Sequence, residues 1–201
     1  MNKIILIGGA PTTGKSFVSQ KLANELSLPW ISTDVIRSIM IKTVRKEDYP
    51  GLFYTTTANA KNYLEEHSVQ EIINDQNNES KEVWRGVQTF VDARYSGDWE
   101  SCIVEGIALL PQLVHAAMKE HKGLQSIFLY EDRKERIREI IFTRGLWDDA
   151  EKYSDDVKEK EVEWVMLFNQ FIKDEATKYG FPLIQYKDDG SHFEEIKKLL
   201  V

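Results

Sequence analysis

The segment Gly9-Ala10-Pro11-Thr12-Thr13-Gly14-Lys15-Ser16 constrains the fold of this chain more than any other feature. Its spacing matches G-x-x-x-x-G-K-[ST], the pattern of a P-loop, whose backbone N–H groups surround phosphate groups. In such a loop we expect Lys15 to reach the β- and γ-phosphates of a nucleotide and the Ser16 hydroxyl to bind Mg²⁺. The predicted nucleotide-binding residues are Gly9, Ala10, Pro11, Thr12, Thr13, Gly14, Lys15, Ser16 and Phe17.

The segments on both sides of this loop fit the same interpretation. The apolar run Ile4-Ile5-Leu6-Ile7 is typical of a buried parallel strand. Residues 16–28 carry apolar side chains at helical spacing. A strand, a loop and a helix in this order place the loop at a helix N-terminus, where the helix dipole favours an anion. An ordinary glycine-rich turn is the alternative, and the flanking pattern disfavours it.

Apolar runs and helical patterns alternate along the rest of the chain. We expect further strands at 29–32, 101–106, 125–130 and 182–186, and helices at 33–44, from Pro111, at 131–144, up to Tyr179 and at 192–200. Strands that alternate with helices imply a parallel sheet covered on both faces. The sequence therefore predicts an α/β fold, with a P-loop NTPase-type parallel sheet of about five strands and helices on both faces.

The length of 201 residues predicts one domain, spanning residues 1–201. A helical insertion is expected at about 45–95, on the acceptor side of the site, with helices at 57–75 and 79–95 joined by a polar linker. A short lid is expected at about 144–156, where a loop follows the charged helix. Such a lid would exclude water from a reacting phosphate.

The composition restricts the classes of partner. A net charge of -7 argues against a general binder of nucleic acid, although a small anion needs only a local basic site. No apolar run approaches the roughly 18 residues of a membrane span, and the early strand leaves no room for a signal peptide. Cys102 is the only cysteine, so no internal disulfide can form. We expect a cytoplasmic monomer or homodimer that binds neither nucleic acid nor membrane.

Two carboxylates and one arginine follow predicted strands, at the edge of the sheet where ligands of such folds bind. Asp34 and Arg37 open the helix after the second strand, and Glu105 ends the strand at 101–106. Asp34 could instead cap its helix, a role for which Ser32 and Thr33 compete. Arg37 could be a solvated helix residue. Glu105 could lie near Mg²⁺ or bond to the backbone, since a buried carboxylate needs a partner.

The helix expected at 131–144 supplies several positive charges. Arg144 lies seven residues after Ile137 of the apolar stripe, so it should point along the core-facing edge toward the site. Arg136 is the next candidate, as a nucleotide contact. Arg133 and Arg138 are more simply explained by ion pairs with neighbouring glutamates. Phosphoryl transfer depends mainly on positioning and on positive charge around the migrating group, which Lys15 and Arg144 would supply.

Three stretches and the C-terminal region carry a resemblance to a known family. Residues 7–16, 31–37, 103–111 and the region 152–184 resemble the 2-phosphoglycerate kinase family. The Ser-Thr-Asp-Val-Ile-Arg stretch at 32–37 is also similar to nucleoside monophosphate kinases, whose aspartate and arginine there face the acceptor. The first forty residues resemble chloramphenicol phosphotransferase, which implies that Asp34 is a catalytic base.

These features together predict an ATP-dependent kinase that uses Mg²⁺ and transfers the γ-phosphate to a small molecule. The acceptor could be a phosphorylated acid such as 2-phosphoglycerate, a nucleoside monophosphate, or a hydroxyl of an antibiotic or sugar. The expected catalytic residues are Lys15, Asp34 and Arg144, and the expected substrate-binding residues are Asp34, Arg37 and Glu105. A nucleotide-binding switch is the non-enzymatic alternative. A GTPase would need an N-K-x-D motif after a strand, and the only Asn-Lys pair, Asn2-Lys3, precedes the P-loop.

Overall fold

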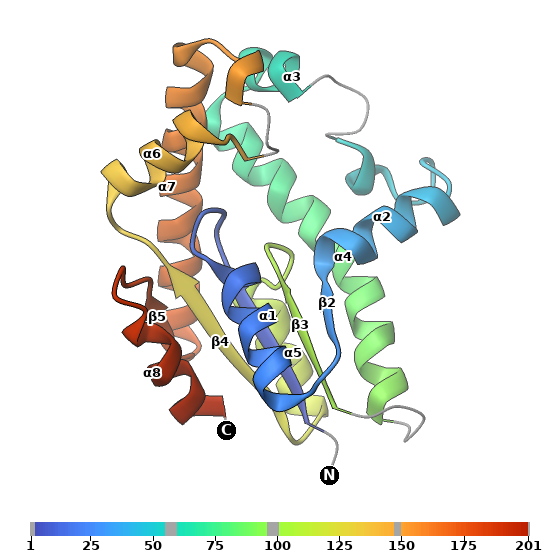
Figure 1. Ribbon diagram of the computed structural model, residues 1–201. Helices are drawn as coiled ribbons and strands as arrows, with labels where there is room; N and C mark the ends of the chain where they lie inside the picture. The colour runs from blue at the N-terminus through green and yellow to red at the C-terminus, as the bar shows by residue number, and fades with distance from the viewer. Residues whose placement is uncertain (1–2, 55–59, 96–100, 147–149, 201) are drawn as a thin grey trace.

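The structure is a computed structural model. In the part of the chain that it describes, five parallel strands form a central sheet (Figure 1). The described residues are 3–54, 60–95, 101–146 and 150–200. The strand order is β2-β3-β1-β4-β5. The strands are β1 (Ile4–Gly9), β2 (Trp30–Ser32), β3 (Cys102–Gly106), β4 (Leu124–Tyr130) and β5 (Leu183–Gln185). The predicted α/β fold with a P-loop NTPase-type parallel sheet is confirmed.

Helices cover both faces of this sheet. Helices α1 (Lys15–Leu26) and α8 (Ser191–Leu200) lie on one face, and α5 (Pro111–Glu120) and α7 (Asp155–Lys178) lie on the other (Figure 1). Successive side chains of a strand point to opposite faces. Ile5 and Ile7 of β1 accordingly pack in one buried cluster with residues of α1 and α8, whereas Ile4 and Leu6 belong to the other. Burial on both faces explains why β1 is apolar throughout.

The remaining elements lie toward the carboxyl edge of the sheet, except that α4 runs from there along the sheet toward the amino end of β3 (Figure 1). They are α2 (Thr33–Thr43), the 3₁₀ turn η1 (Pro50–Phe53), α3 (Ala60–Glu66), α4 (Val69–Tyr95), α6 (Lys134–Thr143) and the 3₁₀ turn η2 (Ala150–Lys152). Helix α4 packs against α2, η1 and α7, and α6 packs against α7. Among the described residues, none of the helices is long and apolar enough to span a membrane.

The expected break between two helices at the polar linker is wrong, because α4 continues from Val69 to Tyr95. A capping box starts this helix: Ser68 Oγ accepts from the Glu71 N–H at 3.3 Å, and Glu71 Oε2 accepts from the Ser68 N–H at 2.8 Å. The buried stripe also continues through the polar stretch, where Glu79 and Ser80 occupy buried positions that apolar residues hold elsewhere. The polar composition therefore concealed a continuous helix.

The end of β3 packs tightly against the start of α2. Gly106 has φ +152°, and a Cβ at this position would lie 1.8 Å from Thr33 Oγ1. Only glycine fits such a conformation and such a close approach. Ser32 and Glu105 also pair in the parallel register of β2 and β3. This packing brings the first turn of α2, which carries Asp34, next to the carboxyl end of β3.

Candidate active site

The P-loop is held in shape by its own side chains. Gly14 adopts φ +83° and forms the N-cap of α1. Both the Thr13 hydroxyl and the Lys15 ammonium donate to the Ala10 carbonyl, each at 2.8 Å. Gly9, Ala10 and Thr13 are buried, whereas Lys15 is half-buried and Ser16 is exposed. The loop thus presents its lysine and serine at the surface of the site, at the N-terminus of a twelve-residue helix.

Lys15 lies near two carboxylates, Glu105 at the end of β3 and Asp34 in the first turn of α2. The Ser16 hydroxyl donates to Glu105 Oε1 at 3.2 Å. Burial lowers the pKa of Lys15, and the nearby carboxylates of Glu105 and Asp34 oppose this effect. Burial also raises the pKa of Glu105, with the Lys15 ammonium acting in the opposite direction. The structure therefore brings together four residues that sequence analysis selected from three separate stretches: Lys15 and Ser16 of the P-loop, Asp34, and Glu105.

Asp34 is not needed to cap its helix, because Ser32 does so. The Ser32 hydroxyl accepts a hydrogen bond of 3.2 Å from the Asp34 N–H, and Ser32 is the N-cap of α2. The Asp34 side chain is exposed and lines a pocket with Lys15 and Glu105. No hydrogen bond of its carboxylate is found within residues 3–54, 60–95, 101–146 and 150–200. The carboxylate is thus placed to contact a ligand.

Two pockets meet at the P-loop. The first has a volume of about 910 Å³ and lies between the P-loop, α6 and the segment after β5. The second has a volume of about 400 Å³ and lies between the P-loop, α2, α4 and α7. Four residues line both: Thr12, Lys15, Ser16 and Arg144. Two ligands that occupied these pockets would therefore face each other across Lys15 and Arg144.

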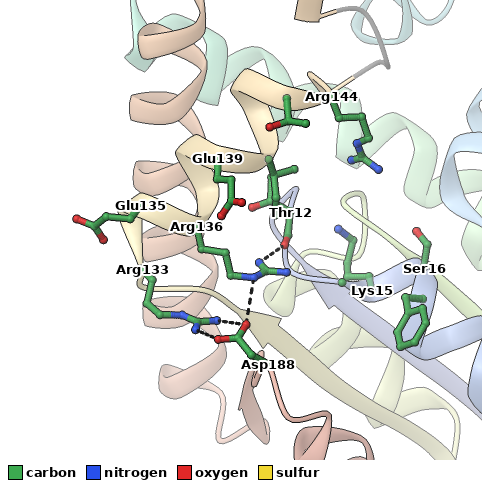
Figure 2. A pocket seen from close by; sticks show the side chains of 13 residues that line it. Thr12, Lys15, Ser16, Arg133, Glu135, Arg136, Glu139, Arg144 and Asp188 are labelled. Carbon is green, nitrogen blue, oxygen red and sulfur yellow. Dashed lines mark hydrogen bonds and ion pairs between the residues drawn. The ribbon is translucent and has the colours of Figure 1, made fainter.

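Arg136 is fixed against the P-loop in the first pocket, as Figure 2 shows. Its guanidinium donates to the Thr12 carbonyl at 2.9 Å and lies 3.7 Å from the centre of the Tyr186 ring. The fully buried Glu131 accepts from Arg133 at 2.8 Å and lies 3.3 Å from Arg136. The pairing of Arg133 with a glutamate was expected. Gly14 and Phe17 also line this pocket.

Arg144 forms the C-cap of α6 and is exposed. In Figure 2 its side chain extends from α6 toward the part of the pocket where Lys15 and Ser16 lie. Arg138, by contrast, pairs with Glu159 of α7 at 2.6 Å, outside both pockets. Residues 147–149 of the expected lid and residues 55–59 of the expected insertion lie outside the described residues.

The second pocket contains Arg37, which sequence analysis selected, and residues that it did not select, among them Glu79. Arg37 pairs with Glu79 of α4 at 2.8 Å and donates to the Leu52 carbonyl at 3.4 Å. Gln76 of α4 and Trp164 of α7 also line it. The insertion at about 45–95 was expected on the acceptor side, but the spacing of α4 does not indicate which of its residues reach the pocket, because this depends on tertiary packing. Sequence analysis also missed Asp188, which lines the first pocket, and Tyr186, whose ring lies under Arg136. Both follow the carboxyl end of β5, and ligands of parallel sheets bind at the carboxyl ends of the strands, so this rule could have found them.

The oxygen atoms at Ser16 and Glu105 fit a magnesium ion. A hydroxyl and a carboxylate oxygen only 3.2 Å apart are hard donors of the kind that Mg²⁺ prefers. Within the described ranges, no group of three or more His, Cys, Asp or Glu side chains could hold a metal. Mg²⁺ usually keeps several waters and takes its other ligands from substrate phosphates, so a site with few protein donors is consistent with it.

The fold and the phosphate loop define an α/β protein of the P-loop NTPase type. More specifically, the chain belongs to the cytidylate kinase-like family, whose sequence profile matches residues 4–180. A gluconokinase from Sinorhizobium meliloti has a similar structure, with a TM-score of 0.51 and 13% identity over 99% of this chain and 89% of that one. At this identity the likeness concerns the fold alone.

Two relatives in sequence carry the name 2-phosphoglycerate kinase. The protein of Methanopyrus kandleri is 24% identical over 96% of this chain and 57% of its own length. The protein of Methanothermobacter thermautotrophicus is 24% identical over 98% of this chain and 65% of its own length. The chain thus spans less than two thirds of each of these relatives. The resemblance to 2-phosphoglycerate kinases that the sequence predicted is confirmed by these two relatives.

Proposed function

We propose that this chain is an ATP-dependent kinase that transfers the γ-phosphoryl group to a hydroxyl of a small molecule. The observation that carries the proposal is the position of Lys15 and Arg144, which line both the larger and the smaller pocket. Asp34 lines only the smaller one. Two positive charges between the pockets and a carboxylate on one side of them match the needs of phosphoryl transfer.

The nucleotide would occupy the larger pocket, with its phosphates on the P-loop. The backbone N–H groups at the start of α1 would bind the β-phosphate, and Lys15 would exchange its contact with the Ala10 carbonyl for phosphate oxygens. Arg136 lies beside the same loop, fixed by Thr12 and Tyr186. A bound Mg²⁺, held by Ser16 with Glu105 nearby, would neutralise charge on the phosphates.

The acceptor would occupy the smaller pocket and present its hydroxyl to the γ-phosphorus. The hydroxyl oxygen forms the new O–P bond, and the bond from the γ-phosphorus to the bridging oxygen breaks, so that ADP leaves with that electron pair. Asp34 accepts the hydroxyl proton and aligns the oxygen, which requires a distance of about 2.6–3.2 Å. Arg144, at the end of α6, stabilises the charge on the migrating group.

The names of the relatives make 2-phosphoglycerate the first acceptor to test. Nucleoside monophosphates and the hydroxyls of antibiotics or sugars are the alternatives within this reaction class. A nucleotide-binding switch without catalysis would leave the second pocket and Asp34 without a role. The insertion at about 45–95 would form the acceptor side and the segment 144–156 the lid, in a cytoplasmic monomer or homodimer that does not bind nucleic acid or membrane.

A coupled assay of ADP release tests this function. ATP and Mg²⁺ are supplied with each member of a panel of hydroxyl compounds, phosphorylated and unphosphorylated. The proposal predicts that at least one compound accelerates ADP release well above the rate with water alone. If ATP binds to the folded protein and no acceptor accelerates ADP release, the kinase assignment is wrong and a nucleotide-binding role replaces it.

A further inference from the structure

The arginine on the acceptor side of the site is already paired with a carboxylate of the same protein. Arg37 lies 2.8 Å from Glu79 Oε2, and the two side chains are 22% and 11% exposed. Arg37 also donates to the Leu52 carbonyl at 3.4 Å. Glu79 and Leu52 belong to α4 and η1 respectively, two elements that pack against each other. The guanidinium is therefore held from two sides by the protein itself.

The charges around the smaller pocket, which is proposed above to hold the acceptor, are balanced without a ligand. Its lining contains three cationic side chains, Lys15, Arg37 and Arg144, and three acidic ones, Asp34, Glu79 and Glu105. Lys15 and Arg144 also line the larger pocket, which is proposed to hold the nucleotide, and there they would contact the phosphates of ATP. Within the described lining, Arg37 is then the cation that belongs to the acceptor side alone, and Glu79 neutralises it.

A phosphorylated or carboxylated acceptor would be poorly matched to this environment. Its anionic group would lie near Asp34 and Glu79, and like charges in a partly buried site repel each other. To bind Arg37 it would have to displace Glu79, which would leave a buried carboxylate without its partner, and such a group is costly. The lining also contains neutral polar side chains away from the P-loop, Ser38 and Gln76, which suit hydroxyls.

We propose that the acceptor of this kinase is a hydroxyl compound without phosphate or carboxylate groups, and that Glu79 determines this preference by holding Arg37. The inference rests on the proposed function. The proposed acceptor differs from 2-phosphoglycerate, the acceptor that the names of the relatives suggest. Glu79 acts as a specificity-determining residue, since its contact is with Arg37 rather than with the reacting atoms.

The first test compares matched acceptors on the wild-type protein. Each pair contains a phosphorylated compound and its unphosphorylated counterpart, such as glycerol phosphate with glycerol, a nucleoside monophosphate with the nucleoside, and a sugar phosphate with the sugar. 2-Phosphoglycerate, which carries both a phosphate and a carboxylate, is tested beside them as a phosphorylated member. The inference predicts transfer to the unphosphorylated members. Transfer mainly to phosphorylated members would overturn it while the kinase assignment stands. Transfer to neither class would overturn the kinase assignment, and the inference with it.

The second test uses Glu79→Gln, which keeps the size of the side chain and removes its charge. Freed from its ion pair, Arg37 should bind an acceptor phosphate, so kcat/KM for phosphorylated acceptors should rise about tenfold, as expected for one charge-assisted hydrogen bond. The KM for ATP should not change. Glu82→Gln on the same helix, whose partner is Arg85, is the matched control. Equal acceptor profiles for wild type and a folded Glu79→Gln variant would overturn the role of Glu79. The wild-type comparison decides the acceptor class even if that variant does not fold.

Discussion

Ser16 of the P-loop donates a hydrogen bond of 3.2 Å to Oε1 of Glu105, which is nearly fully buried at the end of the adjacent strand β3. The two residues are 89 positions apart, and the pairing of β1 with β3 brings them together. Glu105 lies near Lys15 as well, whose ammonium favours its ionised form. A buried carboxylate of this kind costs the fold stability, and we infer that it is kept for the ligand.

Glu105→Gln should therefore stabilise the ligand-free protein and weaken its binding of Mg-ATP. Burial raises the pKa of Glu105 above the ordinary 4.5. At a pH between 4.5 and this raised pKa, Glu105 keeps its proton in the folded state, whereas the unfolded chain has released it. The free energy of unfolding contributed by this group then falls as the pH rises from 4.5 through the raised value. The variant should lose this decline, and urea unfolding between pH 4 and about 8 would measure it.

The affinity for Mg-ATP should fall by about 10- to 100-fold in the same variant, as for other residues that support a metal ligand. Calorimetric titration measures this effect. Glu163→Gln, in an exposed part of α7, is the matched control and should change neither quantity. A Glu105→Gln variant that is less stable at pH 7 and binds Mg-ATP normally would assign Glu105 a structural role only.

Lys15→Ala should reduce phosphoryl transfer on the order of 10³-fold or more, because this ammonium supplies charge to the migrating group. The fold should survive, since the Lys15 ammonium donates to a carbonyl of its own loop, that of Ala10, and the residue is only half-buried. Steady-state ADP release and thermal unfolding are the measurements. Lys21→Ala is the control and should keep wild-type rates, because Lys21 is exposed on α1, lies over the Phe193 ring of α8 and lines neither pocket. Unchanged rates in a folded Lys15→Ala variant would refute the role of the P-loop.

Arg144→Ala should lower kcat far more than it weakens ATP binding, by a factor on the order of 10³, if its charge acts mainly in the transition state. Arg138→Ala is the control, because Arg138 pairs with Glu159 of α7 outside both pockets and should contribute little. Steady-state kinetics with ATP and acceptor varied separately distinguishes the two effects. A rise in KM for ATP at constant kcat would make Arg144 a ground-state contact instead.

Asp34→Asn should abolish most of the transfer while the melting temperature stays nearly constant. Asparagine keeps the shape of the side chain and removes its ability to accept the proton. Helix α2 should not suffer, because Ser32 is its N-cap. Ser32→Ala should in contrast reduce stability by about 1 kcal/mol. Kinetics and thermal unfolding of both variants measure this, and an active Asp34→Asn variant would leave Glu105 as the next candidate for the base.

Local sequence patterns were sufficient to predict the elements that carry the P-loop side of the site. The apolar run of β1, the glycines of the loop and the helical spacing of α1 lie within 28 residues of the N-terminus. The strands that follow also end in polar residues, so Asp34 and Glu105 could be selected before their distance was known. The carboxyl ends of parallel strands lie at one edge of the sheet, and this rule predicted that Asp34 and Glu105 would lie near the P-loop.

The contacts made by α4 on the acceptor side could not be predicted in this way. Glu79 contacts Arg37 from α4, and this contact depends on how a helix of 27 residues packs against α2 and α7. The same helix was expected to break, because its polar residues obscured the buried stripe. The capping box formed by Ser68 and Glu71 was present in the sequence and marks its true start. Long-range packing thus decides the specificity side of the site, which local patterns do not encode.

The measurement that tests the central claim most directly follows the γ-phosphate itself. ATP labelled at the γ-position is incubated with Mg²⁺, an active acceptor and either the wild-type protein or Asp34→Asn, and the labelled products are separated. We predict that the wild type transfers the label to a new phosphoester of the acceptor and that Asp34→Asn does so far more slowly. Label that stays in ATP, or appears only as inorganic phosphate, would contradict the assignment of this chain as a small-molecule kinase.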